Sequence, residues 1–286
     1  MSAFILPGSN PPVSIHLPPD LSQAQFLSFP ALKIWLSTLQ HSLARQQNTS
    51  HPFNLAPYTL RSIDVQAVDF FGSNRLGFVK LKADVSADDG QKLPGAVFLR
   101  GGSVGILLII QPDDLPQGSD GEKQVILTVQ PRIPAGSLAF IELPAGMIDD
   151  AGSFAGAAAN EIQEETGLTI RADELIDMSA LTLLAQNDAS ADHTGVVEEE
   201  KERLENAVYP SPGGCDEFIP LFLCQKRMAR TEISQLEGRL TGLRNEGEMI
   251  TLKLVPLDNL WKEAARDGKA LAAWALYQGL RKEERI

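Results

Sequence analysis

Three glutamates are spaced so that their carboxylates would share one face of a helix. Glu161 lies three residues before Glu164 and four before Glu165, and side chains at these spacings are neighbours on a helix surface. Like charges there repel one another, and a hard divalent cation, which prefers oxygen ligands, would remove the repulsion. The spacing therefore indicates a divalent-metal site. A solvated acidic face is the alternative that these three residues alone leave open.

The flanking residues predict a strand, a turn and a short helix around these glutamates. Ser153 is a suitable N-cap and Gly167 a suitable residue just past a helix end. Residues 143–146, Leu-Pro-Ala-Gly, close an apolar segment with a glycine turn. Such a turn can direct backbone carbonyls toward an ion held by the helix. The combination favours the metal site over the solvated face.

This stretch resembles the Nudix box, G-x5-E-x7-R-E-U-x-E-E-x-G-U, where U is an aliphatic residue. The glycines, glutamates and aliphatic residues that match are Gly146, Glu161, Ile162, Glu164, Glu165, Gly167 and Leu168. Two positions depart: Gly152 stands at the first glutamate and Asn160 at the arginine. In the family that arginine helps to hold the catalytic glutamates. Its loss indicates either lower activity or a protein that only binds its ligand.

The flanking segments 127–149, 209–217 and 242–260 resemble the corresponding segments of ADP-ribose and ADP-sugar pyrophosphatases. The resemblance extends discontinuously over about residues 60–285 and is greatest to the plant and fungal-type ADP-sugar diphosphatases. It implies that the metal ligands are Ala145, through its carbonyl, and Glu161, Glu164, Glu165 and Glu248. It implies catalytic roles for Glu246, as the general base, and for Glu164. The substrate contacts that it implies are Arg132, Glu142 and Glu217.

Each residue outside the acidic helix has an ordinary structural alternative. Arg132 after a strand is otherwise an exposed cation. Glu217 follows a proline- and glycine-containing loop and can simply cap it. Glu246 and Glu248 straddle a glycine before a strand, which is also typical of a solvated turn.

The implied reaction is hydrolysis of the diphosphate bond of ADP-ribose or ADP-glucose to AMP and a sugar phosphate, with Mg²⁺ or alternatively Mn²⁺ as cofactor. Two alternatives stay open. One is a non-catalytic module that binds a nucleotide sugar. The other is a hydrolase of a different diphosphate: NADH, a dinucleoside polyphosphate, or a prenyl or inositol diphosphate. Relatives in this branch form dimers, so we expect a homodimer.

The remaining sequence predicts the elements that hold this site. Alternating apolar residues predict three strands of a small antiparallel sheet at 61–71, 76–85 and 96–100. More continuous apolar segments predict buried strands at 104–110, 123–130, 138–145, 174–186, 218–228 and 247–257. Helices are expected at 29–46, 153–167, 257–268 and 269–284.

Together with the resemblance, these elements predict an α/β fold: a Nudix α/β/α sandwich with a mixed sheet, plus a small β-rich N-terminal domain. We expect an N-terminal arm and helix over 1–57, in which residues 1–29 have little regular structure. The small β-rich domain would span 58–100 and the Nudix domain 101–286. An acidic, polar insertion interrupts the latter at about 187–208.

The composition excludes several classes of partner. With 25 Lys plus Arg against 37 Asp plus Glu, the net charge is -12, so no general attraction to nucleic acid or anionic membranes is expected. The cysteines, Cys215 and Cys224, form neither a disulfide framework nor a zinc spacing. The longest aliphatic run, 104–110, is too short to cross a bilayer. We therefore expect a cytoplasmic protein that acts on a small-molecule nucleotide sugar.

Overall fold

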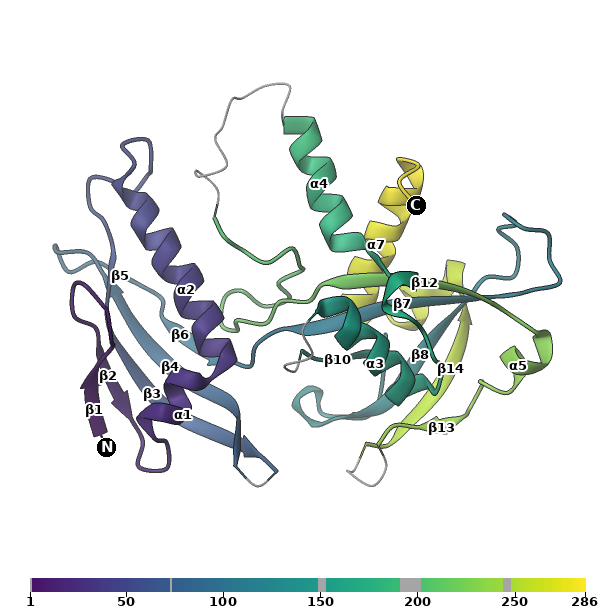
Figure 1. Cartoon of the computed structure of the whole chain (residues 1–286), viewed down its shortest axis with the longest axis horizontal. Helices are drawn as coiled ribbons and strands as arrows, with labels where there is room; N and C mark the ends of the chain where they lie inside the picture. Colours follow the sequence, from purple (N-terminus) through teal and green to yellow (C-terminus); the bar gives the residue numbers. More distant parts are fainter. Residues whose placement is uncertain (1, 73, 149–152, 191–201, 244–247) are drawn as a thin grey trace. The chain divides into compact units, whose positions relative to one another are not determined.

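The computed structural model describes residues 2–72, 74–148, 153–190, 202–243 and 248–286 (Figure 1). The chain divides into two compact units. The first consists mainly of the residues up to Gly102, joined by residues 211–218. The second consists mainly of the residues from Ser103 onward. Each unit has its own sheet and its own buried core.

The first unit is a sheet covered by helices. Within the described residues the sheet has six strands in the order β1-β2-β3-β4-β5, with β6 also on β4. The bounds of the strands are β1 Ser2–Ile5, β2 Ser14–Leu17, β3 Thr59–Phe71, β4 Arg75–Ser86, β5 Lys92–Leu93 and β6 Ala96–Leu99. The helices are α1 Gln23–Ser28, α2 Pro30–Ala44 and the 3-10 turn η1 Arg45–Gln47. Alternate residues of β4, such as Val79 and Leu81, are fully buried in the core beneath the helices.

The three strands and the helix predicted between residues 29 and 100 are confirmed, but the prediction for residues 1–29 is wrong. That segment forms β1, β2 and α1 rather than an irregular arm. Strand β2 buries Ile15 and Leu17 and pairs in parallel with β3, more than 40 residues away along the chain. Four residues are too few for a recognisable strand pattern. The strand that pairs with β2 lies too far along the chain to be recognised from the local sequence. Helix α1 begins at a capping box in which Ser22 and Gln25 bond each other's backbone N–H.

The second unit is built on a mixed sheet. Its described strands number eight, in the order β11-β12-β7-β8-β14-β13, with β10 on β7 and β9 on β8. Their bounds are β7 Ser103–Pro112, β8 Gln124–Arg132, β9 Ser137–Glu142, β10 Ala145–Met147, β11 Ile176–Asp177, β12 Leu221–Met228, β13 Leu240–Thr241 and β14 Ile250–Pro256. Strands β7 and β12 run parallel, and the other described pairs of this sheet are antiparallel.

Helices cover both faces of this sheet. Their bounds are α3 Phe154–Thr166, α4 Met178–Ser190, α5 Arg230–Ser234, α6 Leu260–Glu263 and α7 Gly268–Lys282, with 3-10 turns η2 Ile133–Ala135, η3 Ala172–Glu174 and η6 Leu257–Asn259. Every residue of β7 is buried. Ile106 belongs to the core that includes Ile162 of α3, whereas Leu107 belongs to the core that includes Tyr277 of α7. This alternation identifies an α/β/α sandwich with a mixed sheet, which confirms the predicted fold class.

The predicted strand at 174–186 is wrong. Only Ile176–Asp177 is extended, and residues from Met178 form α4. The Asp177 carboxylate accepts the Ala180 N–H at 2.9 Å, so it caps the helix. The run that follows is rich in alanine and leucine, which are good helix formers, and has few β-branched residues. Helix α4 continues into the acidic insertion as far as Ser190, whereas residues 191–201 lie outside the described part.

The other predicted strands and the closing helices of the second unit are confirmed. The helix expected at 257–268 is shorter than predicted, since it consists of η6 followed by the four-residue α6. The described helices include none long and apolar enough to cross a membrane.

Candidate functional site

Helix α3 begins and ends at the residues that the sequence indicates. The Ser153 hydroxyl accepts the Gly156 N–H at 3.1 Å and so caps the first turn. Gly167 ends the helix in the left-handed conformation, with φ of 73°, and donates its N–H to the Gln163 carbonyl. Ala158 and Ile162 are fully buried against the sheet. These contacts fix the helix, and its packing on β10 sets where its glutamates lie.

The side chain of Glu165 is buried and held by neutral donors. Its residue is 5% exposed, and its two carboxylate oxygens accept the Ala145 backbone N–H at 3.0 Å and the Gln130 side-chain amide at 3.3 Å. Burial and then the charge of Glu161 raise the pKa of Glu165 to about 8. Thr241 donates its hydroxyl to the carbonyl of the same residue. The two hydrogen bonds therefore fix the orientation of this carboxylate, but they do not offset the effect of burial on its charged form.

The carboxylate of Glu161 lies directly over Gly146. A Cβ atom added to this glycine would be 1.8 Å from the Cδ atom of Glu161. Any residue with a side chain at this position would displace the Glu161 carboxylate, which occupies the space of a Cβ atom. Glu161 and Glu165 thus converge from one helix onto the Ala145–Gly146 backbone of β10. The sequence spacing predicted that the two glutamates share one side of the helix. The structure shows that this side is directed toward β10.

The other predicted metal and catalytic residues are less enclosed. Glu164 is exposed, as is Asn160 at the position of the family's arginine. Glu248 is exposed and accepts the Leu243 N–H at 3.1 Å. Glu246 and Gly152 lie outside the described residues.

Within the described chain, no group of three or more His, Cys, Asp and Glu side chains forms a complete metal cluster. The described residues supply a carboxylate pair, Glu161 and Glu165, beside the backbone of Ala145. A hard cation bound there would take further oxygen ligands from that backbone, from solvent or from a ligand.

The predicted substrate residues Arg132 and Glu142 form an ion pair. The guanidinium Nε of Arg132 donates to Glu142 at 2.6 Å, and Lys269 donates to the second oxygen of the same carboxylate at 2.9 Å. Lys269 also donates to Asp267 at 3.0 Å. Burial alone lowers the pKa of Lys269, but Asp267 and Glu142 together raise it. Glu142 is therefore enclosed by positive charge at the end of β9.

Sequence reasoning missed Asp267, which connects α7 to the segment before β10. One of its oxygens accepts the Leu143 N–H at 2.9 Å and the other accepts the Lys269 N–H at 3.0 Å. It also missed Gln130, since an amide inside a predicted strand has no recognisable pattern. The one available signal for Asp267 was its suitability as a helix N-cap before 268–282.

Glu217 belongs to the first unit. It forms an ion pair with Arg100 at 2.7 Å, and its side chain is 16% exposed. The neighbouring Asp216 accepts the backbone N–H groups of Arg100 and Gly101. Burial raises the pKa of Asp216. These contacts attach the loop of residues 211–218 to the end of β6.

Comparison with known proteins identifies the family. Residues 116–274 match the NUDIX domain. The chain is 38% identical over 227 residues to Nudix hydrolase 14, chloroplastic, of Arabidopsis thaliana. That alignment covers 79% of this chain, and the chain spans 64% of the length of the relative. A solved structure described as an ADP compounds hydrolase aligns with a TM-score of 0.43 and 14% identity, over 80% of this chain and 99% of that one.

The chain belongs to the Nudix family, since the family domain matches more than half of it. The predicted family is confirmed.

Proposed function

We propose that the chain hydrolyses the diphosphate bond of a nucleoside diphosphate sugar, ADP-ribose or ADP-glucose, to AMP and a sugar phosphate. The observation that carries this proposal is the convergence of Glu161 and Glu165 on the backbone of Ala145 and Gly146. Carboxylate and carbonyl oxygens are suited to a hard divalent cation. The family membership adds support, and the choice of an ADP-sugar comes from the resemblance of the flanking segments.

The residues present fit a bound Mg²⁺. Glu165 is buried between neutral donors and its pKa is raised to about 8, so a cation beside it would compensate a charge that burial disfavours. Glu161, Glu165 and the Ala145 carbonyl would hold the ion, with Glu164 and Glu248 assisting; Mn²⁺ is an alternative. When bound, the ion neutralises the diphosphate oxygens and lowers the pKa of an attacking water.

The remaining proposed residues bind substrate or move a proton. Glu246 is the proposed general base, and it accepts the proton of the attacking water. Arg132 lies at the exposed side of its pair with Glu142, with 40% of its side chain accessible. It is proposed to contact the phosphates or the base. Glu217 is proposed to contact the sugar, in which role its pairing with Arg100 would fix its orientation.

The decisive assay is release of AMP from ADP-ribose and ADP-glucose with and without Mg²⁺. We expect Mg²⁺-dependent turnover that Glu161→Gln nearly abolishes. Turnover of the wild-type protein that survives EDTA would refute the metal requirement. A parallel panel of NADH, a dinucleoside polyphosphate, and prenyl and inositol diphosphates, followed by phosphate analysis, tests the substrate class.

The departures from the Nudix box favour one alternative function. Asn160 replaces the arginine that supports the catalytic glutamates, so a module that binds a nucleotide sugar without cleaving it is the second candidate. Calorimetry with ADP-ribose and Mg²⁺, followed by analysis of the same sample for AMP, separates the two. Tight binding without AMP would establish the module.

A homodimer in the cytoplasm completes the proposal. The name of the Arabidopsis relative assigns that protein to the chloroplast, so imaging of the tagged full chain would test the location. Gel filtration that shows a monomer at micromolar concentration would count against the dimer.

A further inference from the structure

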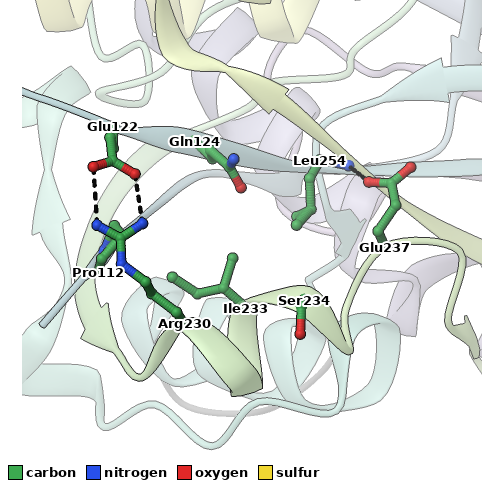
Figure 2. A pocket seen from close by; sticks show the side chains of 8 residues that line it. All are labelled: Pro112, Glu122, Gln124, Arg230, Ile233, Ser234, Glu237 and Leu254. Atoms are coloured by element: carbon green, nitrogen blue, oxygen red, sulfur yellow. Dashed lines mark hydrogen bonds and ion pairs between the residues drawn. The ribbon is translucent and has the colours of Figure 1, made fainter.

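An open pocket lies in the Nudix unit at the end of β8 away from the carboxylate pair. It has a volume of about 340 Å³ and is bordered by α5 and by residues of β7, β8 and β14 (Figure 2). Gln124 begins β8 and Gln130 lies two residues before its end at Arg132. Being six residues apart, the two glutamines point to the same face. At about 3.4 Å per residue, the two side chains are separated by about 20 Å. The pocket is therefore distinct from the proposed diphosphate site.

Gln124 gives this pocket an unused hydrogen-bond acceptor. Its Oε1 atom is buried and has no hydrogen-bond partner among the described residues. Figure 2 shows its amide projecting into the space between the strand and α5, with Ile233 on the opposite side. Buried acceptors without a donor are costly and rare in folded proteins. Rotation of the amide about its last side-chain bond would present this oxygen to a ligand in the pocket that donates an N–H.

The charges around the pocket select against anions. Its one lining cation, Arg230, makes two hydrogen bonds to Glu122, at 2.7 and 2.9 Å, and a third to Asp114 at 2.7 Å. Arg230 holds the pKa values of both carboxyls below their ordinary range. Glu237 adds another carboxylate at the far end, where it accepts the Leu254 N–H at 2.6 Å. The acidic groups outnumber the single arginine, so a phosphate or carboxylate ligand would be repelled.

Apolar groups form the remaining walls. Pro112, Ile233 and Leu254 line the pocket, and Ile233 belongs to the buried core beneath α3. Flat apolar surface is suited to a ring, and the polar groups around it fix the ring's orientation. Glu122, which also lines the pocket, has a φ of 53°. This lies in the left-handed region, which is unfavourable for residues other than glycine.

We propose that this pocket binds a small planar ligand with N–H donors and no negative charge, such as an amidinium-bearing or amino-substituted ring. The N–H donors would bond Gln124, the carboxylate of Glu237 would attract the positive charge of an amidinium, and the ring would pack on Ile233 and Leu254. This site goes beyond the proposed hydrolysis and does not depend on it.

The test uses three probes with the same ring and different charge: benzamidine, benzamide and benzoate. Each is titrated into the full-length protein while the methyl NMR signals of Ile233 and Leu254 are followed. Benzamidine is expected to bind with a Kd on the order of 1 mM, as suits a fragment of its size. Benzamide should bind more weakly, and benzoate should leave both signals unchanged.

Variants locate the contacts. Gln124→Met should weaken benzamidine about tenfold, because it removes a hydrogen bond from a charged donor. Glu237→Gln should also weaken it about tenfold, because it removes a charge. Ser234→Ala is the matched control from the same wall. Its hydroxyl already donates to the Thr231 carbonyl at 2.8 Å, so the Kd should not change. Glu161→Gln should also leave benzamidine binding unchanged, which separates this site from the diphosphate site.

Three results would overturn the proposal. The first is benzoate binding as tightly as benzamidine. The second is a benzamidine Kd that neither Gln124→Met nor Glu237→Gln changes. The third is an absence of any methyl shift with all three probes at about twenty times the expected Kd, which would leave ordered water as the sole occupant of the pocket.

Discussion

Glu142 and Glu165 are buried almost equally, at 3% and 5% exposed, but their surroundings differ in charge. Glu142 accepts from the guanidinium of Arg132 and the ammonium of Lys269. Glu165 accepts from a backbone amide and a side-chain amide, both neutral. The first carboxylate is balanced by cations of the protein itself. The second carboxylate is oriented by neutral donors, whereas burial disfavours its charged form.

This difference shows that burial of a carboxylate does not by itself indicate a metal site. The charge of its partners is the more informative property, because a buried ion is tolerated only where an opposite charge compensates it. At Glu142 that charge comes from elsewhere in the fold. At Glu165 it would come from a bound cation, and the raised pKa of this residue reflects burial and the repulsion of Glu161.

The largest expected effect comes from Glu165→Gln. Mg²⁺-dependent AMP release should fall by about three orders of magnitude, since metal ligation contributes several kcal/mol of transition-state stabilisation. In EDTA at neutral pH the same variant should be more stable than the wild type by about 1–2 kcal/mol. Burial raises the pKa of Glu165, which destabilises the folded protein above the ordinary pKa of the carboxyl, and glutamine has no such cost. Product analysis and urea denaturation measure the two effects. A loss of stability in EDTA would remove the contrast with Glu142.

Glu142→Gln should behave in the opposite way and destabilise the protein with or without Mg²⁺. The substitution leaves Lys269 buried with one carboxylate instead of two, and it also removes the charge opposite Arg132. The expected loss is about 2–3 kcal/mol, less than for a fully buried pair because Arg132 is 40% exposed. Urea denaturation in Mg²⁺ and in EDTA provides the measurement. Equal stability of the variant and the wild type would show that the ion pairs contribute nothing net.

Asp267→Asn should have a smaller effect. The asparagine carbonyl still accepts the Leu143 N–H, while the charge opposite Lys269 is lost. We expect a loss of about 1 kcal/mol in stability and less than tenfold in AMP release. Asp267→Ala, which also removes the acceptor for Leu143, is the comparison variant. If both variants lose the same stability, the hydrogen bond to Leu143 is not what connects α7 to the site.

Glu164→Gln is expected to have the smallest effect on stability, within about 0.5 kcal/mol, since the side chain is exposed. Mg²⁺ should still raise the Tm of this variant, whereas it should not raise the Tm of Glu165→Gln. Thermal unfolding with and without Mg²⁺ compares them. A Glu164→Gln protein that no longer responds to Mg²⁺ would place the exposed glutamate among the main ligands.

Local signals in the sequence predicted the framework of the site. Ser153 and Gly167 bounded α3 correctly because capping depends on residues within one turn of the helix end. The spacing of Glu161 and Glu165 predicted a shared face for the same reason. The glycine turn and the family pattern both indicated that residues 143–146 face the helix. Neither specified the contact of Glu161 with Gly146, because the two segments meet through tertiary packing.

Features that depend on distant contacts were not predicted. Gln130 and Asp267 lie on elements that approach α3 and β10 only through tertiary packing. Local sequence patterns do not predict that packing. Helix α4 was predicted as a strand because a short apolar run does not distinguish the two states. Asp177, which caps the helix, was the residue that indicated α4. A capping residue before a short apolar run favours a helix over a strand.

The parallel pairing of β7 with β12 also determines the order in which this protein can fold. Gly105 of β7 pairs on one side with Ala145 and on the other with Leu221, which is 116 residues further along the chain. Contacts this distant in sequence close large loops and form slowly. During synthesis, the strand that supports Ala145 gains the neighbour on its other side only after about three-quarters of the chain has left the ribosome. The carboxylate pair is encoded midway through this interval, but the sheet beneath it is completed only afterwards.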